Sequence, residues 1–216
     1  MAKLHTLARI GQAIWFDYIR RSLITSGEMQ SLIDQGVRGV TSNPTIFEKA
    51  IAGSSDYDDD LEALVREGAS VEEIYERLAL TDIGLTADLF RKVYDETGGL
   101  DGYVSIEVSP ELAYDTKRTI EEARRLFYLL GRPNIMIKVP ATKEGVPAIE
   151  TLIAEGINVN VTLLFSVRRY EEVANAYLNG LEKLLASGRD IRSVASVASF
   201  FVSQTSCVSE RISPGA

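Results

Sequence analysis

Strand-like and helix-like segments alternate along most of this 216-residue chain, and the alternation is what most restricts its fold. Short runs rich in Val, Ile, Phe, Tyr and Thr, bounded by polar or turn-forming residues, are typical of buried strands. Such runs predict strands at 13–18, 37–42, 103–108, 135–140, 159–165 and 194–202. Strands that alternate with helices over short connections imply a parallel sheet with right-handed crossovers.

Apolar residues at helical spacing fill the stretches between these runs. We expect helices at 22–35, over most of 45–97, and at 116–130, 146–154 and from 167 onward. Ser70 and Glu73 have the spacing of a capping box, which marks a helix start. The acidic run Asp56–Asp60 suits a helix N-terminus, and Ser109-Pro110 favours a short helical turn.

Composition excludes several classes of protein. The net charge of −8 argues against non-specific binding to nucleic acid or anionic membranes, although it leaves room for a local basic pocket that binds a phosphate. One cysteine, Cys207, excludes an internal disulfide framework, and the single histidine, His5, leaves little for a His-rich metal site. No uncharged run approaches the ~18 residues of a membrane span, and the N-terminus lacks signal-peptide features. We therefore expect a soluble cytoplasmic protein.

Lys138 interrupts the most apolar of the predicted strands, the run IMIKVP at 135–140. A half-buried strand tolerates an ammonium group only if the group reaches solvent, pairs with an acid or loses its proton. Burial disfavours the charged form, and a neutral lysine is a nucleophile that can form a Schiff base with a ketone. The alternative is a strand-end charge that pairs with a nearby carboxylate.

Polar side chains also occur late in the other predicted strands or directly after them. In a parallel β/α barrel the carboxyl ends of the strands converge on one face, where active sites lie. No GxGxxG or P-loop motif supports a dinucleotide or nucleoside triphosphate site. The sequence thus predicts a β/α barrel with a lysine-centred site and no metal, its candidate residues being Asp17, Asn43, Glu107, Lys138, Asn160, Thr162 and Ser199.

Five segments, in this order, resemble the transaldolase family, most closely its longer bacterial branch. They are GVTSNPTIFEKAI (39–51), VSIEVSPELAYDT (104–116), IMIKVPAT (135–142), GINVNVTLLFS (156–166) and SVASFFVS (196–203). The resemblance implies a (β/α)8 barrel that transfers a dihydroxyacetone unit from a ketose phosphate to an aldose phosphate. It also implies a lysine Schiff base, no metal or organic cofactor, and a place in the pentose phosphate pathway.

Carried over residue by residue, the resemblance makes Lys138 the Schiff-base lysine. Asp17 matches the aspartate that takes a hydroxyl proton during carbon–carbon cleavage. Glu107 and Thr162 match the pair that holds a catalytic water for proton transfers. The resemblance further implies that the dihydroxyacetone portion is oriented by Asn43, Asn160 and Ser199.

Each assignment has a structural alternative. Asp17 could pair with Arg20 or Arg21, and Asn43, which precedes a proline, could only form a turn. Glu107 could form an ion pair with Lys138. The remaining polar residues could serve packing alone, as a buried hydrogen-bonded pair (Asn160 and Thr162) or as a small side chain (Ser199). We interpret Trp15, Phe16, Phe200 and Phe201 as core residues, and His5 and Cys207 as bystanders.

The resemblance ends near residue 203. Gln204 stands where the family usually has a phosphate-binding arginine, and 205–216 lacks the apolar content of a further barrel segment. A complete barrel usually needs ~250 residues, so we interpret 1–203 as an incomplete barrel with six of eight strands and 204–216 as an atypical tail. Besides transaldolase activity on sugar phosphates, two hypotheses stand: an inactive fragment that self-associates through sheet edges, and another lysine aldolase.

Overall fold

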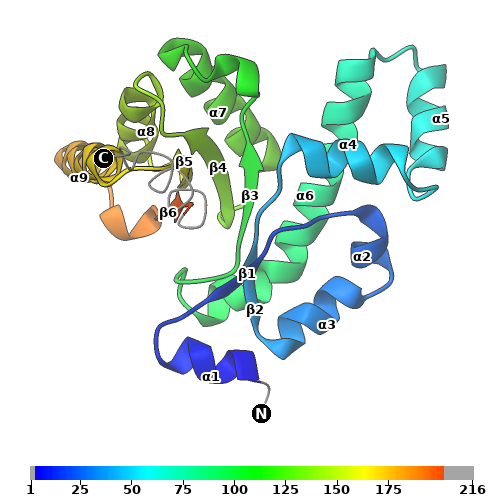
Figure 1. The fold of residues 1–216 in the computed structure, drawn as a ribbon, viewed down its shortest axis with the longest axis horizontal. Coiled ribbons are helices and arrows are strands. Elements are labelled where there is room, and N and C mark those ends of the chain that lie inside the picture. The colour runs from blue at the N-terminus through cyan, green and yellow to red at the C-terminus, as the bar shows by residue number, and fades with distance from the viewer. Residues whose placement is uncertain (1–2, 202–216) are drawn as a thin grey trace, which may run out of the picture. The chain divides into compact units, whose positions relative to one another are not determined.

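The computed structural model describes residues 3–201, which divide into two compact units. The first unit contains residues 3–107 and 130–135, and the second contains 108–129 and 136–201. The predicted tail at 204–216, with Gln204 and Cys207, lies outside the described residues. Each unit is an α/β arrangement of parallel strands and helices, and each is described by itself (Figure 1).

The first unit is built on three parallel strands in chain order, β1 (Ile14–Phe16), β2 (Val37–Val40) and β3 (Tyr103–Glu107). Gly39 of β2 pairs with Trp15 of β1 and with Tyr103 of β3. A Cβ atom on Gly39 would lie 2.5 Å from the Trp15 ring, so the indole packs directly on the backbone of β2. This contact supports the interpretation of Trp15 as a packing residue.

Six helices accompany these strands within residues 3–107. They are α1 (Lys3–Arg9), α2 (Arg21–Thr25), α3 (Glu28–Gln35), α4 (Pro44–Ala52), α5 (Asp58–Arg66) and α6 (Val71–Glu96). The predicted capping box begins α6: Glu73 N donates to Ser70 Oγ at 3.2 Å, and Ser70 N donates to Glu73 Oε2 at 2.8 Å. The apolar face of α6 is fully buried at Ile83, Ala87 and Phe90.

The second unit contains β4 (Ile135–Pro140, whose first residue belongs to the first unit), β5 (Val159–Leu164) and β6 (Ser196–Phe200), again parallel and in chain order. Its helical segments are η1 (Pro110–Leu112), α7 (Thr116–Leu130), α8 (Gly145–Ala154), α9 (Val167–Ala186) and η2 (Ile191–Ser193), of which α7 ends in the first unit. Helices α8 and α9 pack closely, because a Cβ on Gly180 would lie 2.8 Å from both Glu150 O and Ile153 Cβ.

The aromatic residues of β6 and its end pack against other aromatic side chains. The rings of Phe201 and Phe165 stack with centroids 5.4 Å apart, and Phe200 meets Tyr170 edge to face at 6.5 Å. These contacts agree with packing roles for Phe200 and Phe201.

All six predicted strands are confirmed, β4 with the predicted bounds and the other five shorter, and so is the parallel α/β class. The single helix expected at 22–35 is wrong: Gly27, with φ of +83°, separates α2 from α3. Helix α1 was not expected, because its seven residues carry no capping signal. In the part of the chain that the structure describes, no helix has the length and apolar character to span a membrane.

Candidate functional site

Lys138 lies in the middle of β4, where all six residues are buried. Its side chain is 8% exposed, between Ile137 and Val139, which are both fully buried. The strand holds this position through backbone hydrogen bonds: Ile137 N donates to Asn158 O at 2.9 Å, and Val108 N donates to Lys138 O at 3.2 Å. The predicted placement of an amine within a buried strand is therefore confirmed.

Asn160 of β5 is the register partner of Lys138, so the two side chains project from the same side of neighbouring strands. Asn160 is fully buried, and Thr162, two residues further along, is 3% exposed. Ser199 Oγ of β6 donates to Asn160 Oδ1 at 3.0 Å. The second unit thus places four of the predicted site residues on three adjacent strands. The hydroxyl group of Ser199 fixes the amide group of Asn160.

A bulge follows Thr162. Val161 pairs with Ala198, and Leu164 pairs with Phe200. Between these two pairs β5 advances by three residues and β6 by two. The bulge includes Leu163, which is the only non-glycine with positive φ (61°) among residues 3–201 and is 45% exposed. Bulges change the direction in which neighbouring side chains point. Here the regular register between β5 and β6 is interrupted after Val161, next to Thr162.

In the first unit, Asp17 directly follows β1 and is exposed. Thr41 Oγ1, just beyond β2, donates a hydrogen bond to Asp17 Oδ1. The alternative that Asp17 pairs with Arg20 or Arg21 is wrong, because these arginines bind other carboxylates: Arg20 lies 3.9 Å from Asp56, and Arg21 Nη1 lies 2.6 Å from Asp60 Oδ2.

Asn43 is the N-cap of α4, where its Oδ1 accepts from Ile46 N at 3.0 Å and Pro44 follows at the first helical position. Asn43 thus has a local structural role, which is to cap a helix rather than to form only a turn. This role fixes the amide at the carboxyl end of β2, next to Ser42, whose Oγ donates to Ser105 O of β3 at 2.8 Å.

Glu107 is the last residue of β3 and is half-buried. The negative charge of Glu107 acts on the phenol of Tyr75 in α6, a residue that the sequence analysis did not identify. Burial raises the pKa of the Tyr75 phenol to about 12, with further contributions from the negative charges of Glu48 and Glu107. No sequence signal identifies Tyr75, because it lies in an ordinary helical segment 32 residues from Glu107 along the chain.

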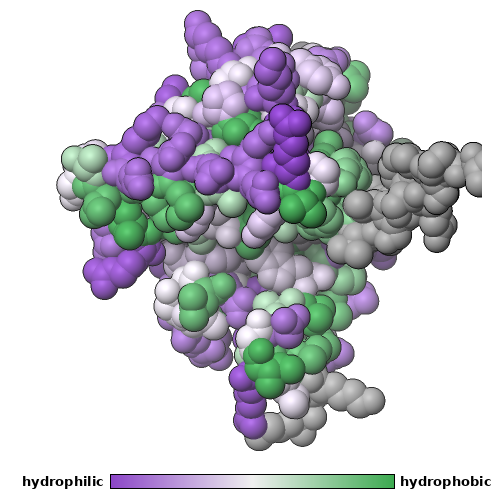
Figure 2. All heavy atoms as spheres, turned by 60° about the vertical axis from the view of Figure 1, so that its left-hand side comes forward, coloured by the Kyte–Doolittle hydropathy of each residue, from purple (hydrophilic) through white to green (hydrophobic). Residues whose placement is uncertain are grey.

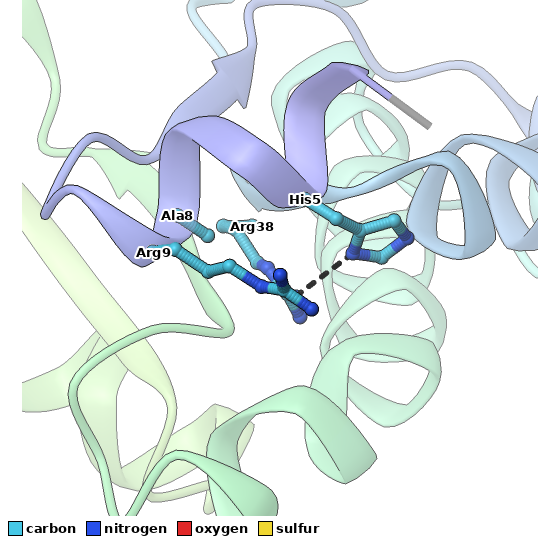
Figure 3. A pocket seen from close by; sticks show the side chains of 4 residues that line it. All are labelled: His5, Ala8, Arg9 and Arg38. Atoms are coloured by element: carbon cyan, nitrogen blue, oxygen red, sulfur yellow. Dashed lines mark hydrogen bonds between the residues drawn. The ribbon is translucent and has the colours of Figure 1, made fainter. Parts of the chain in front are cut away.

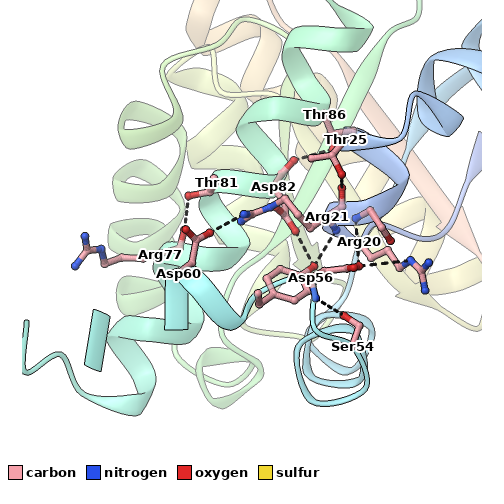
Figure 4. A network of polar contacts seen from close by, with 12 residues as sticks. Arg20, Arg21, Thr25, Ser54, Asp56, Asp60, Arg77, Thr81, Asp82 and Thr86 are labelled. Atoms are coloured by element: carbon pink, nitrogen blue, oxygen red, sulfur yellow. Dashed lines mark hydrogen bonds and ion pairs between the residues drawn. The ribbon is translucent and has the colours of Figure 1, made fainter. Parts of the chain in front are cut away.

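The sequence analysis also did not identify a buried hydrogen-bond network around Asp82 of α6 (Figure 4). Asp82 is 0% exposed. Arg21 Nε donates to Asp82 Oδ1, and Tyr57 Oη donates to Asp82 Oδ2 at 2.8 Å. Tyr57 Oη in turn accepts from Arg21 N at 3.0 Å. Burial raises the pKa of the Asp82 carboxyl, against the hydrogen bonds from Arg21 and Tyr57, which lower it. Since the network ties α2 to α5 and α6, it is structural.

The fold and these residues define a class: an α/β protein of parallel strands, with a buried lysine on one strand and amide and hydroxyl groups on the next two. Residues 14–213 match the family model described as transaldolase/fructose-6-phosphate aldolase. The chain belongs to this family, whose fold is a (β/α)8 barrel, and the part of the chain that the structure describes supplies six of the eight strands.

Several relatives are named transaldolases. "Transaldolase 2" of Nostoc punctiforme and "Transaldolase" of Trichodesmium erythraeum are each 55% identical to this chain over 199 residues, which is 92% of the chain and 52% of the relative. "Transaldolase" of Saccharopolyspora erythraea is 50% identical over 204 residues, or 94% of the chain and 55% of the relative. The chain therefore spans about half the length of these relatives.

Proposed function

We propose that this chain carries transaldolase chemistry: it transfers a dihydroxyacetone unit from a ketose phosphate to an aldose phosphate through a Schiff base on Lys138. The donor is sedoheptulose 7-phosphate or fructose 6-phosphate, and the acceptor is erythrose 4-phosphate or glyceraldehyde 3-phosphate. The observation that carries the proposal is the burial of Lys138 to 8% exposure within an all-buried strand. Membership of the family and the names of the relatives support it.

The chemistry follows from the amine. The Lys138 Nζ atom attacks the ketone carbon, and the resulting carbinolamine loses water to give a protonated imine. The carbon–carbon bond next to the imine breaks as a hydroxyl loses its proton, and the electron pair moves into the imine as an enamine. The enamine then attacks the aldehyde of the acceptor, and water releases the product from the lysine. Burial of Lys138 keeps bulk water from the imine before the acceptor arrives.

The remaining roles rest on the family resemblance. Glu107 and Thr162 hold the water that moves protons when the imine forms and breaks, and Asp17 takes the hydroxyl proton during cleavage. The dihydroxyacetone portion is oriented by Asn43, Asn160 and Ser199. The hydrogen bond from Ser199 to Asn160 supports this orienting role, because it fixes the amide on the strand beside Lys138.

The test is acceptor-dependent transfer. With fructose 6-phosphate and erythrose 4-phosphate, we expect sedoheptulose 7-phosphate and glyceraldehyde 3-phosphate to form, measured by mass spectrometry. Lys138→Met should abolish the transfer, whereas Lys143→Met, at an exposed lysine five residues later, should not. Absence of product from the folded chain would favour the inactive-fragment hypothesis.

The family description also names fructose-6-phosphate aldolase, and this second candidate gives a different result in the same experiment. An aldolase releases free dihydroxyacetone from fructose 6-phosphate without any acceptor. A transaldolase retains the dihydroxyacetone unit on Lys138 until the acceptor is added. We further propose that the reaction belongs to the pentose phosphate pathway in the cytoplasm.

A further inference from the structure

Asp17 follows β1 in a stretch without regular secondary structure, and it is exposed. Among residues 3–201 its side chain has one hydrogen bond, which its Oδ1 atom accepts from Thr41 Oγ1. An exposed carboxylate keeps its rotamer freedom unless a contact restricts it. The orientation of the Asp17 carboxylate therefore depends on where the hydroxyl group of Thr41 is held.

The backbone on both sides of Thr41 is fixed to neighbouring strands. Thr41 N donates to Phe16 O at 2.9 Å, so the pairing of β1 with β2 continues past Val40, the last residue of β2. The next residue, Ser42, is 1% exposed, and its Oγ atom donates to Ser105 O of β3 at 2.8 Å. Thr41 is thus bound to β1, and the residue that follows it is bound to β3.

Strand β2 is also held near its amino end (Figure 3). Arg38, the second residue of β2, donates from Nη2 to His5 Nδ1 of α1 at 3.4 Å. These two residues, with Ala8 and Arg9, line a basic pocket of about 430 Å3 beside α1. Hydrogen bonds therefore hold the strand before Thr41 as well as the backbone after it.

We propose that Thr41 is a positioning residue for carbon–carbon cleavage, because its hydroxyl group orients the Asp17 carboxylate for proton transfer. The inference rests on the proposed function, in which Asp17 takes the hydroxyl proton. Asp17 Oδ1 stays bound to Thr41, and Oδ2, which accepts no hydrogen bond among residues 3–201, takes the proton. The carbon–carbon bond breaks, the hydroxyl carbon becomes the aldehyde carbon of the leaving fragment, and the electron pair enters the imine.

The role of the hydroxyl group can be separated from that of the backbone. The bond to Phe16 O uses the backbone N–H group of Thr41, which a valine would keep. Valine is also β-branched and of similar shape, and it is common in strands. Thr41→Val therefore removes the contact with Asp17 and leaves the strand pairing in place.

The experiment follows a single turnover of fructose 6-phosphate by rapid quench. Borohydride traps the imine at each time point, and intact mass distinguishes an adduct of the whole sugar phosphate from an adduct of the dihydroxyacetone unit. Loss of a hydrogen bond to a charged group weakens an interaction by roughly 10-fold or more, so cleavage in Thr41→Val should be slower by at least that factor. The first adduct should form at the rate of the parent chain, and it should therefore accumulate.

Three further variants isolate the hydroxyl group. Thr41→Ser keeps it and should cleave at nearly the rate of the parent chain. Thr41→Ala removes it without placing a methyl group beside the carboxylate, and should be as slow as Thr41→Val. Thr81→Val removes an exposed hydroxyl group of α6, which donates to Arg77 O at 2.7 Å, and should leave cleavage unchanged. Melting curves check the fold of each variant.

Cleavage at the parent's rate in Thr41→Val or Thr41→Ala would overturn the proposal. A Thr41→Ser variant as slow as Thr41→Val would also overturn it, because the hydroxyl group would then not be the cause. A folded parent chain that forms no adduct at all would refute the proposed function itself, and this inference with it.

Discussion

Lys138 occupies β4 between two fully buried side chains, Ile137 and Val139, and is itself 8% exposed. A charged group in such a position carries a desolvation penalty that an apolar residue of similar length would avoid. Strand stability alone therefore does not explain a lysine here. Asn160 lies beside Lys138 in the register of β4 and β5, and Ser199 donates a hydrogen bond to Asn160. The amine therefore has polar neighbours on this side of the strands. The proposed Schiff-base role of Lys138 would account for this combination.

Neutral substitutions of Asp17 and Glu107 should affect different steps of the proposed reaction. Glu107→Gln should slow formation of the imine, because proton transfer by a positioned carboxylate contributes ~10²–10⁴-fold. Asp17→Asn should still form the imine but stall at bond cleavage, since its proposed role begins only there. Rapid-quench borohydride trapping follows the imine, and product analysis follows turnover.

Asp17→Asn also requires a structural control, because Asp17 accepts a hydrogen bond from Thr41. Thr41→Val removes the same hydrogen bond from the other side and keeps the carboxylate. If Asp17→Asn abolished trapping as completely as Lys138→Met while its melting curve matched that of the parent chain, Asp17 would not have the proposed role.

Among the elements, those with strong local signals were predictable. The capping box at Ser70 and Glu73 begins α6, and the apolar spacing at 116–130 gives α7 with the predicted bounds. The break at Gly27 was missed because apolar spacing continues across it, although the left-handed backbone there ends the helix. Apart from β4, the strands are shorter than predicted, since apolar residues continue beyond the ladder hydrogen bonds, as at Tyr18.

The candidate site was predictable to the extent that its residues lie on strands. Burial of Lys138, Asn160 and Thr162 follows from their place in apolar runs. Contacts between distant segments were not predictable, because no local pattern encodes them. The Arg21–Asp82 pair joins residues 61 apart, and the His5–Arg38 contact joins residues 33 apart. His5 was therefore interpreted as a bystander, although it lines a basic pocket.

The Asp82 network predicts a pH-dependent effect for Tyr57→Phe. The folded-state pKa of Asp82 is raised above its ordinary value of 3.8, so its contribution to stability is complete below pH 3.8 and is lost as the pH rises through the folded-state value. Removal of the Tyr57 hydroxyl raises this pKa further, because a hydrogen bond to the carboxylate is lost. The free energy of unfolding should therefore fall by ~1.5–3 kcal/mol more at pH 7 than below pH 3.8, where the loss that remains is that of the Tyr57 acceptor for Arg21 N.

Urea unfolding at a series of pH values measures this effect. Tyr128→Phe removes a hydroxyl from a ring that is 67% exposed, and should change the free energy of unfolding little at any pH. A loss of stability in Tyr57→Phe that is independent of pH would show that its hydroxyl does not act through Asp82.

For the whole molecule, charge and exposed edges have opposite effects on association. The net charge of −8 favours solubility, and Figure 2 shows hydrophilic residues interspersed with hydrophobic ones over the face presented. Among residues 3–201, however, strand β6 ends the strand order in its unit and pairs only with β5. An unpaired strand edge is a template for pairing with another chain. Self-association through this edge is therefore our expectation for the chain as given.

Ala198→Lys tests this expectation. Ala198 is exposed in β6, and a lysine on an edge strand opposes edge-to-edge pairing. Sedimentation velocity should show concentration-dependent association of the parent chain and a shift toward monomer in Ala198→Lys. Ala186→Lys, at the exposed end of α9, adds the same charge away from the edge and should behave as the parent. A parent chain that stays monomeric at all concentrations would exclude edge pairing.

Borohydride reduction in the presence of fructose 6-phosphate tests the central claim most directly, because it turns an imine into a stable adduct on the lysine that formed it. We predict one adduct per chain by intact mass, located by peptide mapping to the segment that contains Lys138, and absent from Lys138→Met. An adduct on Lys143 or Lys49 instead, or a folded chain that forms none, would contradict the account.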